Sequence, residues 1–324
     1  MASTFVADRR SQRYGQILAA GTAFPQHSPV VSVIVVCHNE GKWLRKTVNS
    51  LARTIPPGGE ILVVDDHSTD GSAARLLPQS EVSVLRPKRR LGAPRARNFA
   101  AQRAGGPILV FCDAHIEAPP RWFAPFRAAL ARPKAGLVGP AYTEMNSREE
   151  KYFGLGFIDA GLNCDGLDQL SSSPYEVPLL GGFFLGIRRE LFFEIGGFDP
   201  GFGFWGMEDV ELVMRIWGLG YRCILVPGVE VAHLDGSCRP RAEDYQGDQR
   251  RWIETTLRFA VLHFGERRLR HVFRFYARDP YFPAALAGLA VSDAWEKRAA
   301  IHAKRTRGDE WFFQRFARRQ GWGN

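Results

Sequence analysis

Residues 110–119 read VFCDAHIEAP, and in this stretch an apolar run gives way to an acid and a histidine. The run PILVFC that leads into it has the character of a buried strand. Asp113 and His115 stand two residues apart, so in an extended chain their side chains project to the same side and could converge on one ion. A carboxylate with an imidazole suits Mn²⁺ or another first-row divalent ion better than Ca²⁺, which prefers oxygen ligands alone. The alternative is a strand-end Asp that caps the following turn beside a partly exposed histidine.

Apolar runs alternate with helical patterns on both sides of this stretch. The series is VVSVIVV, KWLRKTVNSLART, EILVVDD, the helix-like TDGSAARLL, VSVL, PRARNFAAQRA, PILVFCD and PRWFAPFRAALA. This βαβ pattern predicts an α/β fold with a largely parallel sheet that helices cover on both faces. Open parallel sheets bind ligands at the carboxyl ends of their strands, which is where Asp113 and His115 are expected. Residues 142–180 have weaker periodicity and are expected to form a long loop region.

Composition narrows the class of protein. The chain of 324 residues is 45% hydrophobic and 24% charged, as is usual for a soluble globular protein. Its formal net charge of +9 suits an anionic partner, such as a nucleotide diphosphate, a nucleic acid or an anionic membrane surface. Five cysteines without CxxC spacing argue against a disulfide framework and a thiolate zinc site, and they favour a cytoplasmic location. No apolar segment reaches the ~20 residues needed to span a bilayer, so any membrane contact would be peripheral, at the inner face.

The chain divides by pattern into three parts. We expect an N-terminal extension over residues 1–29, an α/β domain over 30–240 and a basic helical region over 241–324. In the last part Trp252, Leu257 and Phe259 alternate with arginines, which indicates helices packed on the α/β domain. A helix that lies on a membrane surface is the alternative.

Two further stretches carry polar groups suited to a nucleotide. VVDDHSTDGS places Asp65 and Asp66 at the end of another predicted strand, where a carboxylate can accept a hydrogen bond from a base imide such as that of uracil. Helix capping is the alternative, above all for Asp70. PKRRLGAPRARN holds five cations beside a predicted helix start, an arrangement that suits a diphosphate. A solvated basic face is the alternative reading of that run.

The order of these motifs along residues 30–235 resembles the family 2-like nucleotide-sugar glycosyltransferases of the GT-A fold. The matching stretches are VSVIVVCHNEGKWLRKTVNSL, ILVVDDHSTDGS, RRLGAPRARNFA, FCDAHIE, the block from GGFFLGIRRELFFEIGG through WGMED to ILVP, and VAHL. They look closest to the catalytic domain of polypeptide N-acetylgalactosaminyltransferases, while WGMED is also similar to a segment of β-1,4-galactosyltransferases. The resemblance implies a Rossmann-like GT-A domain with a C-terminal helical appendage.

The resemblance also implies roles for the residues that match family motifs. These are Asp113, His115 and His233 as metal ligands, Asp66 as the reader of uracil, Arg90 and Arg97 at the nucleotide and the sugar, and Trp205 and Glu208 around sugar and acceptor. Val36 stands where the family often has Thr beside the uridine, so that contact would be made by the main chain. Without the resemblance, His233 is better explained as an ordinary structural histidine than as a metal ligand.

The implied reaction is the metal-dependent transfer of a sugar from a UDP-sugar to a saccharide, peptide or lipid-linked acceptor, with no nucleic-acid partner. A bound divalent ion, most naturally Mn²⁺, would neutralise the negative charge that grows on the leaving diphosphate. A metal-dependent hydrolase is one rival class, but it would not need Asp66 or the arginines. A nucleotide- or carbohydrate-binding module is the non-enzyme rival, and it would not need Asp209.

Residues 201–209 read GFGFWGMED and raise two further questions. GFGFWG matches the dinucleotide pattern GxGxxG but follows GGFDP rather than a strand, so we interpret it as a turn that presents Phe204 and Trp205 to a sugar ring. Packing of these aromatic residues in the core is the alternative. Polypeptide N-acetylgalactosaminyltransferases read GGEN where this chain reads GMED, and they retain the anomeric configuration. The added Asp209 could serve as the general base of an inverting transfer. The alternative is that Glu208 and Asp209 only cap the helix VELVMRIWGLG.

Overall fold

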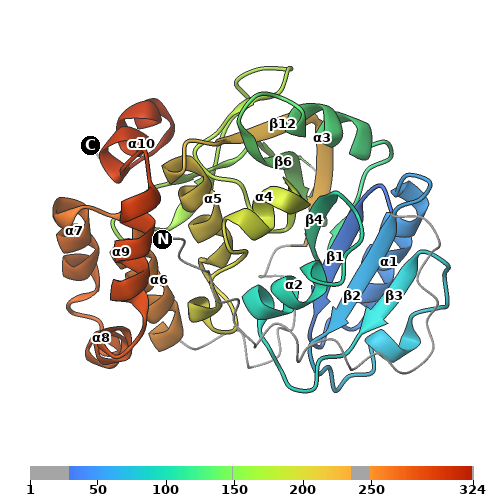
Figure 1. Cartoon of the computed structure of the whole chain (residues 1–324), viewed down its shortest axis with the longest axis horizontal. Helices are drawn as coiled ribbons and strands as arrows, with labels where there is room; N and C mark the ends of the chain where they lie inside the picture. The colour runs from blue at the N-terminus through green and yellow to red at the C-terminus, as the bar shows by residue number, and fades with distance from the viewer. Residues whose placement is uncertain (1–28, 148, 235–248, 323–324) are drawn as a thin grey trace, which may run out of the picture.

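A mixed ten-stranded sheet forms the centre of the molecule (Figure 1). The computed structural model describes residues 29–147, 149–234 and 249–322. The strands lie in the order β10 (Tyr175–Glu176), β12 (Arg222–His233), β6 (Ala135–Glu144), β11 (Phe184–Arg188), β4 (Ile108–Asp113), β1 (Ser32–Cys37), β2 (Glu60–Asp65) and β3 (Val82–Leu85), with β5 (Ile116–Glu117) beside β12 and β7 (Lys151–Tyr152) beside β6.

Alternate residues of the central strands enter two separate cores. In β1, Ile34 belongs to one core, whereas Val33 and Val35 belong to the other. The first core is covered by α2 (Ala93–Ala101), α4 (Arg189–Glu194) and α5 (Glu208–Gly218), and the second by α1 (Lys42–Thr54) and α3 (Phe123–Leu130). The α/β fold with helices on both faces is therefore confirmed, and the predicted helix in KWLRKTVNSLART matches α1.

The half of the sheet that contains β1, β2, β3 and β4 is parallel, as predicted. In the other half β12 runs parallel to β6, but β11 runs antiparallel to both β4 and β6, and β10 runs antiparallel to β12. Between β6 and β11 the chain forms the short strands β7, β8 (Leu155–Phe157), β9 (Cys164–Gly166) and β10. The described part of this connection contains no helix of the kind that usually joins parallel strands, and β11 runs opposite to β6. The prediction of a largely parallel sheet is therefore confirmed for β1 to β4 and for the pair of β6 and β12, and it was wrong for β10 and β11.

The prediction of a helix in TDGSAARLL was wrong. The segment forms only the single 3₁₀ turn η2 (Ala73–Arg75). The Asp70 carboxylate accepts hydrogen bonds from the backbone N–H groups of Ser72 and Gly41, both at 2.8 Å. Gly71 adopts a φ of 72°, which a continuing helix does not allow. Asp70 thus ties the turn to the start of α1, and the capping alternative describes it correctly.

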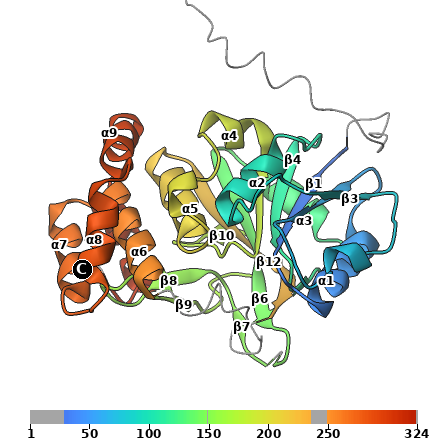
Figure 2. The ribbon, with the colours of Figure 1, turned by 90° about the horizontal axis from the view of Figure 1, so that it is seen from below.

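The C-terminal helices pack on the α/β part of the chain. They are α6 (Gln249–His263), α7 (Glu266–Tyr276), α8 (Phe282–Ala290), α9 (Ala294–Lys304) and α10 (Asp309–Arg315). Figure 2 shows α6 to α9 at one end of the molecule, with α5 between them and the sheet. Leu257 and Phe259 of α6 are fully buried and share a core with Phe157 and Trp217.

Packing thus accounts for the apolar residues of α6, which a helix on a membrane surface would have exposed. The domain limits at residues 29 and 240 stay predictions, because residues 1–28 and 235–248 lie outside the described part of the chain. Among the described helices, none combines the length and the apolar character that crossing a membrane requires.

Phe259→Ala should destabilise the whole protein if α6 shares its core with the sheet. The Phe259 ring contacts the rings of Phe157 and Phe264, so its loss leaves a cavity that costs about 3–5 kcal/mol. Urea unfolding followed by tryptophan fluorescence and circular dichroism should show one transition, moved to lower denaturant. Trp295→Ala, at a side chain that is 47% exposed, is the control and should move it little. A separate transition for the C-terminal helices would contradict the shared core.

Candidate active site

The carboxyl ends of β1, β2 and β4 meet at one edge of the sheet and bring several predicted residues together. Val36 of β1 is the register partner of Asp113, the last residue of β4. Asp66 follows directly after β2. This is the edge at which open α/β sheets bind ligands, so the topology alone gathers Val36, Asp66 and Asp113.

Asp113, His115 and His233 form a cluster whose ligand atoms all lie within 4.8 Å of one another. The Nε2 atoms of His115 and His233 lie 3.5 and 3.4 Å from Oδ2 of Asp113. Pairing of β5 with β12 produces this arrangement, since His233 is the register partner of Ile116, the residue after His115. One carboxylate oxygen and two imidazole nitrogens are a donor set that fits a first-row divalent ion such as Mn²⁺.

The charges around the cluster favour an ionised Asp113. Burial acts to raise the pKa of Asp113, but hydrogen bonds from His115 and His233 and the charges of His115 and Arg97 hold it well below its usual value. Burial acts to lower the pKa of His115, but hydrogen bonds to Asp113 and Glu40 raise it above its usual value. A proton on His115 therefore competes with a metal ion for that nitrogen.

Glu40 is a residue of the site that the sequence reasoning missed. Its Oε2 atom lies 3.2 Å from Nδ1 of His115 and so orients the imidazole. Such carboxylate contacts fix the tautomer and orientation of metal-binding histidines. Glu40 stands three residues after β1, at the same edge of the sheet as Asp113, and this position was the available signal.

Arg97 joins the metal cluster to the start of α5. Its side chain is buried, and its Nη2 donates to Oδ1 of Asp113 at 3.1 Å while its Nη1 donates to Oε1 of Glu208 at 2.8 Å. The other oxygen of Glu208 accepts the backbone N–H of Gly206 at 2.8 Å. Burial raises the pKa of Glu208, and the charge of Arg97 opposes that rise. Three predicted residues from distant segments are thus connected by one guanidinium.

Asp209 follows Glu208 in the first turn of α5 and faces the loop before β11. Its Oδ2 accepts the backbone N–H of Gly182 at 2.7 Å, and its Oδ1 accepts that of Val210 at 2.8 Å. Burial raises the pKa of Asp209, while Arg97 acts to lower it. Met207, just before the helix, has a φ of 64°, a strained conformation for a residue with a side chain. A strained backbone conformation at Met207 therefore places Glu208 and Asp209 at the start of α5.

Asp66 holds the loop that carries Arg90. The Asp66 carboxylate is 1% exposed and accepts the backbone N–H groups of Leu91 at 2.6 Å and Gly92 at 2.8 Å. Gly92 has a φ of 80°, and a Cβ there would lie 2.5 Å from the Cα of Phe204. This geometry gives Asp66 a positioning role, and its contact with a base stays a prediction.

Aromatic residues of the turn before α5 meet the arginine loop and α6. The guanidinium groups of Arg90 and Arg251 each lie 5.0 Å from the ring centre of Phe204. Trp205 is 39% exposed and packs against Trp252 of α6, with ring centres 5.9 Å apart. Two cations thus lie close to the ring of Phe204, whereas Trp205 is partly exposed. No local sequence pattern predicts the contact of α6 with Trp205.

The remaining cations of PKRRLGAPRARN contribute little to this cluster. Lys88 and Arg89 are exposed, and Arg95 is exposed with one hydrogen bond, to the backbone oxygen of Gly203 at 3.5 Å. The solvated-face alternative therefore describes these three residues, whereas Arg97 bonds Asp113 and Glu208 and Arg90 lies against the ring of Phe204.

Two family models match this sequence. The model described as glycosyl transferase family 2 matches residues 32–196, about half of the chain, and the model described as the N-terminal domain of galactosyltransferase matches residues 170–235. Together the two matches contain every residue predicted for the site.

The curated relatives are N-acetylgalactosaminyltransferases. "Probable N-acetylgalactosaminyltransferase 6" of Caenorhabditis elegans is 28% identical over 317 residues, which cover 90% of this chain and 50% of the relative. "N-acetylgalactosaminyltransferase 7" of Homo sapiens is 30% identical over 247 residues, which cover 67% of this chain and 37% of the relative. The chain thus spans half or less of the length of these relatives.

Solved structures agree with the fold. A crystal structure of GalNAc-T7 with UDP, GalNAc and Mn²⁺ superposes with a TM-score of 0.70 at 26% identity, over 91% of this chain and 58% of that one. A mannosyltransferase from Pyrobaculum calidifontis, solved with GDP-Man and Mn²⁺, has a TM-score of 0.51 at 22% identity, over 91% of this chain and 80% of that one. The second likeness shows the fold alone.

The affinity of this chain for Mn²⁺ should rise with pH and should still be rising above pH 6.5, the ordinary pKa of histidine. The raised pKa of His115 is the reason, because the proton must leave before a metal ion can bind. Glu40→Gln removes one of the contacts that raise this pKa, so the midpoint of the pH dependence should move to lower pH. Isothermal titration calorimetry at a series of pH values measures both curves. Glu266→Gln, on the remote helix α7, is the control, and an unchanged midpoint for Glu40→Gln would contradict the assignment.

Proposed function

The chain belongs to glycosyl transferase family 2, and on that premise we propose that it transfers a sugar from a UDP-sugar to a saccharide, peptide or lipid-linked acceptor in a Mn²⁺-dependent reaction. One observation carries the proposal. Arg97 joins Asp113 of the metal cluster to Glu208 of the segment WGMED, so donor-side and acceptor-side groups form one site.

The similar proteins support the choice of donor and ion. The GalNAc-T7 structure contains UDP, GalNAc and Mn²⁺, and it shares both the fold and 26% of the aligned residues with this chain. These facts favour UDP over other nucleotides and make hexoses and N-acetylhexosamines the first donors to test. A hydrolase with the same metal ligands would have no use for the buried arginine that holds Glu208.

Each group of site residues would have its own role in the reaction. Arg90 and the backbone of Val36 would bind the nucleotide, and Asp66 would hold the loop that places Arg90. Trp205 would offer its solvent-facing ring to a sugar, since aromatic faces bind the apolar side of sugar rings. When Mn²⁺ is bound by Asp113, His115 and His233, it offsets the negative charge that grows on the leaving diphosphate.

For the stereochemistry we propose inversion, with Asp209 as the general base. Its carboxylate accepts one backbone N–H at each oxygen, and each oxygen keeps a lone pair that can take a proton from the acceptor. The pKa of Asp209, raised by burial, moves it toward that of an effective base near neutral pH. Glu208 is the weaker candidate because it forms a direct ion pair with the buried Arg97 at 2.8 Å, whose positive charge opposes protonation of the Glu208 carboxylate.

Retention is the second candidate, and two observations favour it. The curated relatives are N-acetylgalactosaminyltransferases. Enzymes of the polypeptide branch of that group retain the anomeric configuration, and they read GGEN where this chain reads GMED. The two backbone hydrogen bonds of Asp209 also fit a structural role, in which Asp209 holds the start of α5 against Gly182. In this case Asp209 would position the helix and take no proton.

A panel of UDP- and GDP-sugars, each offered with Mn²⁺ and a mixture of saccharide, peptide and lipid-linked acceptors, tests the reaction class. We expect transfer from at least one UDP-sugar, detected as a new glycosylated product by mass spectrometry. Arg97→Lys should lower turnover, because a single ammonium nitrogen does not reproduce the planar fork whose two separate nitrogens contact Asp113 and Glu208. Release of free sugar at the same rate with and without acceptors would indicate a hydrolase. Tight donor binding without turnover in any mixture would indicate a binding module.

Asp209→Asn should lower turnover ~10²-fold or more while donor binding changes little, the effect expected for loss of a general base. The amide preserves the hydrogen bond from Gly182 through its oxygen, so the start of α5 should stay in place. Asp165→Asn, at an exposed acid of β9, is the control. The proton spectrum of the product should show a β-linkage from an α-linked donor. An α-linkage, or normal turnover of Asp209→Asn, would overturn inversion and favour retention.

A further inference from the structure

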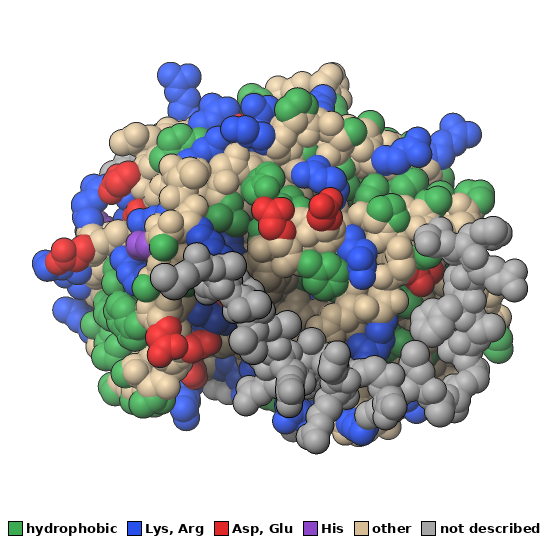
Figure 3. Space-filling model, in the orientation of Figure 1, with side chains coloured by type: hydrophobic (Ala, Val, Ile, Leu, Met, Phe, Trp, Pro, Cys, Tyr) green, Lys and Arg blue, Asp and Glu red, His purple; other side chains and the backbone are tan. Residues whose placement is uncertain are grey.

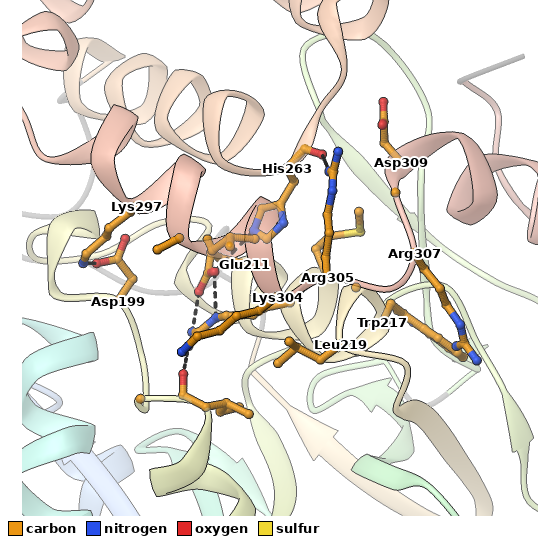
Figure 4. A pocket seen from close by; sticks show the side chains of 18 of the residues that line it. Asp199, Glu211, Trp217, Leu219, His263, Lys297, Lys304, Arg305, Arg307 and Asp309 are labelled. Atoms are coloured by element: carbon orange, nitrogen blue, oxygen red, sulfur yellow. Dashed lines mark hydrogen bonds and ion pairs between the residues drawn. The ribbon is translucent and has the colours of Figure 1, made fainter. Parts of the chain in front are cut away.

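A cavity of about 430 Å³ lies between α5, the turn at residues 194–200 and the helices α9 and α10 (Figure 4). Its volume lies within the range of pockets that bind small organic molecules. None of the residues predicted for the active site lines it. The cavity begins at Glu211, one turn along α5 from Glu208, so it is a neighbouring but separate site.

Three of the four carboxylates that line the cavity have cationic partners. Glu211 pairs with Arg215 at 2.6 Å, and Figure 4 shows the contact of Lys297 with Asp199. Asp309 pairs with Arg268 at 3.2 Å. The fourth, Glu194, accepts a hydrogen bond from the hydroxyl of Tyr221 at 3.4 Å. The three paired carboxylates therefore have little capacity left to neutralise other cations.

Three further cations of the cavity lack such a partner. Lys304, at the end of α9, and Arg305 and Arg307, in the loop between α9 and α10, line it, and within the described residues no carboxylate forms an ion pair with any of them. Arg305 donates to the backbone oxygen of His263 at 3.0 Å, and Arg307 to that of Tyr221 at 3.4 Å. Each guanidinium uses one nitrogen in these bonds and keeps further N–H groups for a ligand.

Positive charges gather around Arg305 at the end of α9. Burial lowers the pKa of Arg305, although the charge of Asp309 acts to raise it, and burial together with Arg305 and Arg298 lowers the pKa of His302 to about 4. The end of α9 is therefore a place where another positive charge is unfavourable and an anion is favourable.

Aromatic and aliphatic side chains form the rest of the wall. The rings of Trp217 and Trp311 have centres 5.8 Å apart, and the guanidinium of Arg307 lies 4.3 Å from the ring centre of Trp311. Met214 and Phe312 complete this apolar surface. A free inorganic anion would leave the apolar surface empty, whereas a ring attached to the anion would fill it.

We propose that this cavity binds a small organic anion that carries an aromatic ring, of the aryl phosphate class. The anionic group lies against Lys304, Arg305 and Arg307, and the ring lies between Met214 and the two tryptophans. Phosphate is the favoured anion because guanidinium groups bind its oxygens in bidentate geometry.

1-Naphthyl phosphate is the probe, measured by calorimetry with the full chain. Inorganic phosphate lacks the ring and 1-naphthol lacks the charge, so both should bind at least tenfold more weakly. n-Hexyl phosphate carries an alkyl chain in place of the ring, and it should bind more weakly than 1-naphthyl phosphate. The double variant Lys304→Gln, Arg307→Gln should reduce affinity for 1-naphthyl phosphate roughly tenfold or more, since it removes two of the three cations.

Further variants locate the bound probe. Ala300→Trp fills the cavity from the exposed side of α9 and should abolish binding while the thermal unfolding curve stays that of a folded protein. Arg274→Gln, at an exposed arginine of α7, is the matched charge control and should leave affinity unchanged. Loss of binding in Arg90→Gln would place the probe at the nucleotide site and overturn the proposal. Equal binding of inorganic phosphate, or tighter binding of n-hexyl phosphate, would overturn the assignment of a ring.

Discussion

The buried guanidinium of Arg97 is the interaction on which the rest of the site depends. It links Asp113 at the end of β4 to Glu208 at the start of α5, two residues that are far apart in the sequence. Burial of so many charges is stable only when each has a partner, and removal of one partner of a buried pair typically costs about 3–5 kcal/mol. Asp113 in turn holds both histidines of the metal cluster. One arginine therefore sets the distance between the metal cluster and the acids of α5.

Lys and Arg side chains are spread over the face of the molecule that Figure 3 shows, and Arg90 and Arg251 lie beside Phe204 at this site. Two loops and one helix build its walls: the loop that Asp66 holds, the turn that presents Trp205, and α6. Because Trp252 of α6 contacts Trp205, the C-terminal helices reach the site as well as the core of the fold. Part of the positive charge of the chain thus lies at this site. Here arginines contact aromatic rings and bind acids near the place where an anionic donor would bind.

The sequence contained enough information for the framework of the site. Strand ends and motif order predicted the edge at which Val36, Asp66 and Asp113 meet, because parallel strands place their carboxyl ends together. The reversal of β11 was not predictable from its own residues, since a buried apolar strand has the same pattern in either direction. Glu40 and the contact of Trp252 with Trp205 depend on how distant segments pack, and no local pattern encodes that. The single turn of η2 was missed because the side-chain bonds of Asp70 outweighed the helical pattern of TDGSAARLL.

Diffraction from crystals grown with UDP and Mn²⁺, recorded at the manganese absorption edge, tests the central claim most directly. The account predicts one anomalous peak within bonding distance of Asp113, His115 and His233, with the diphosphate of UDP on its open side. It also predicts that Arg97 still bridges Asp113 and Glu208 in that complex. A peak at other side chains, or none at saturating Mn²⁺ and UDP, would contradict the claim that this cluster is the metal centre of a UDP-sugar transferase.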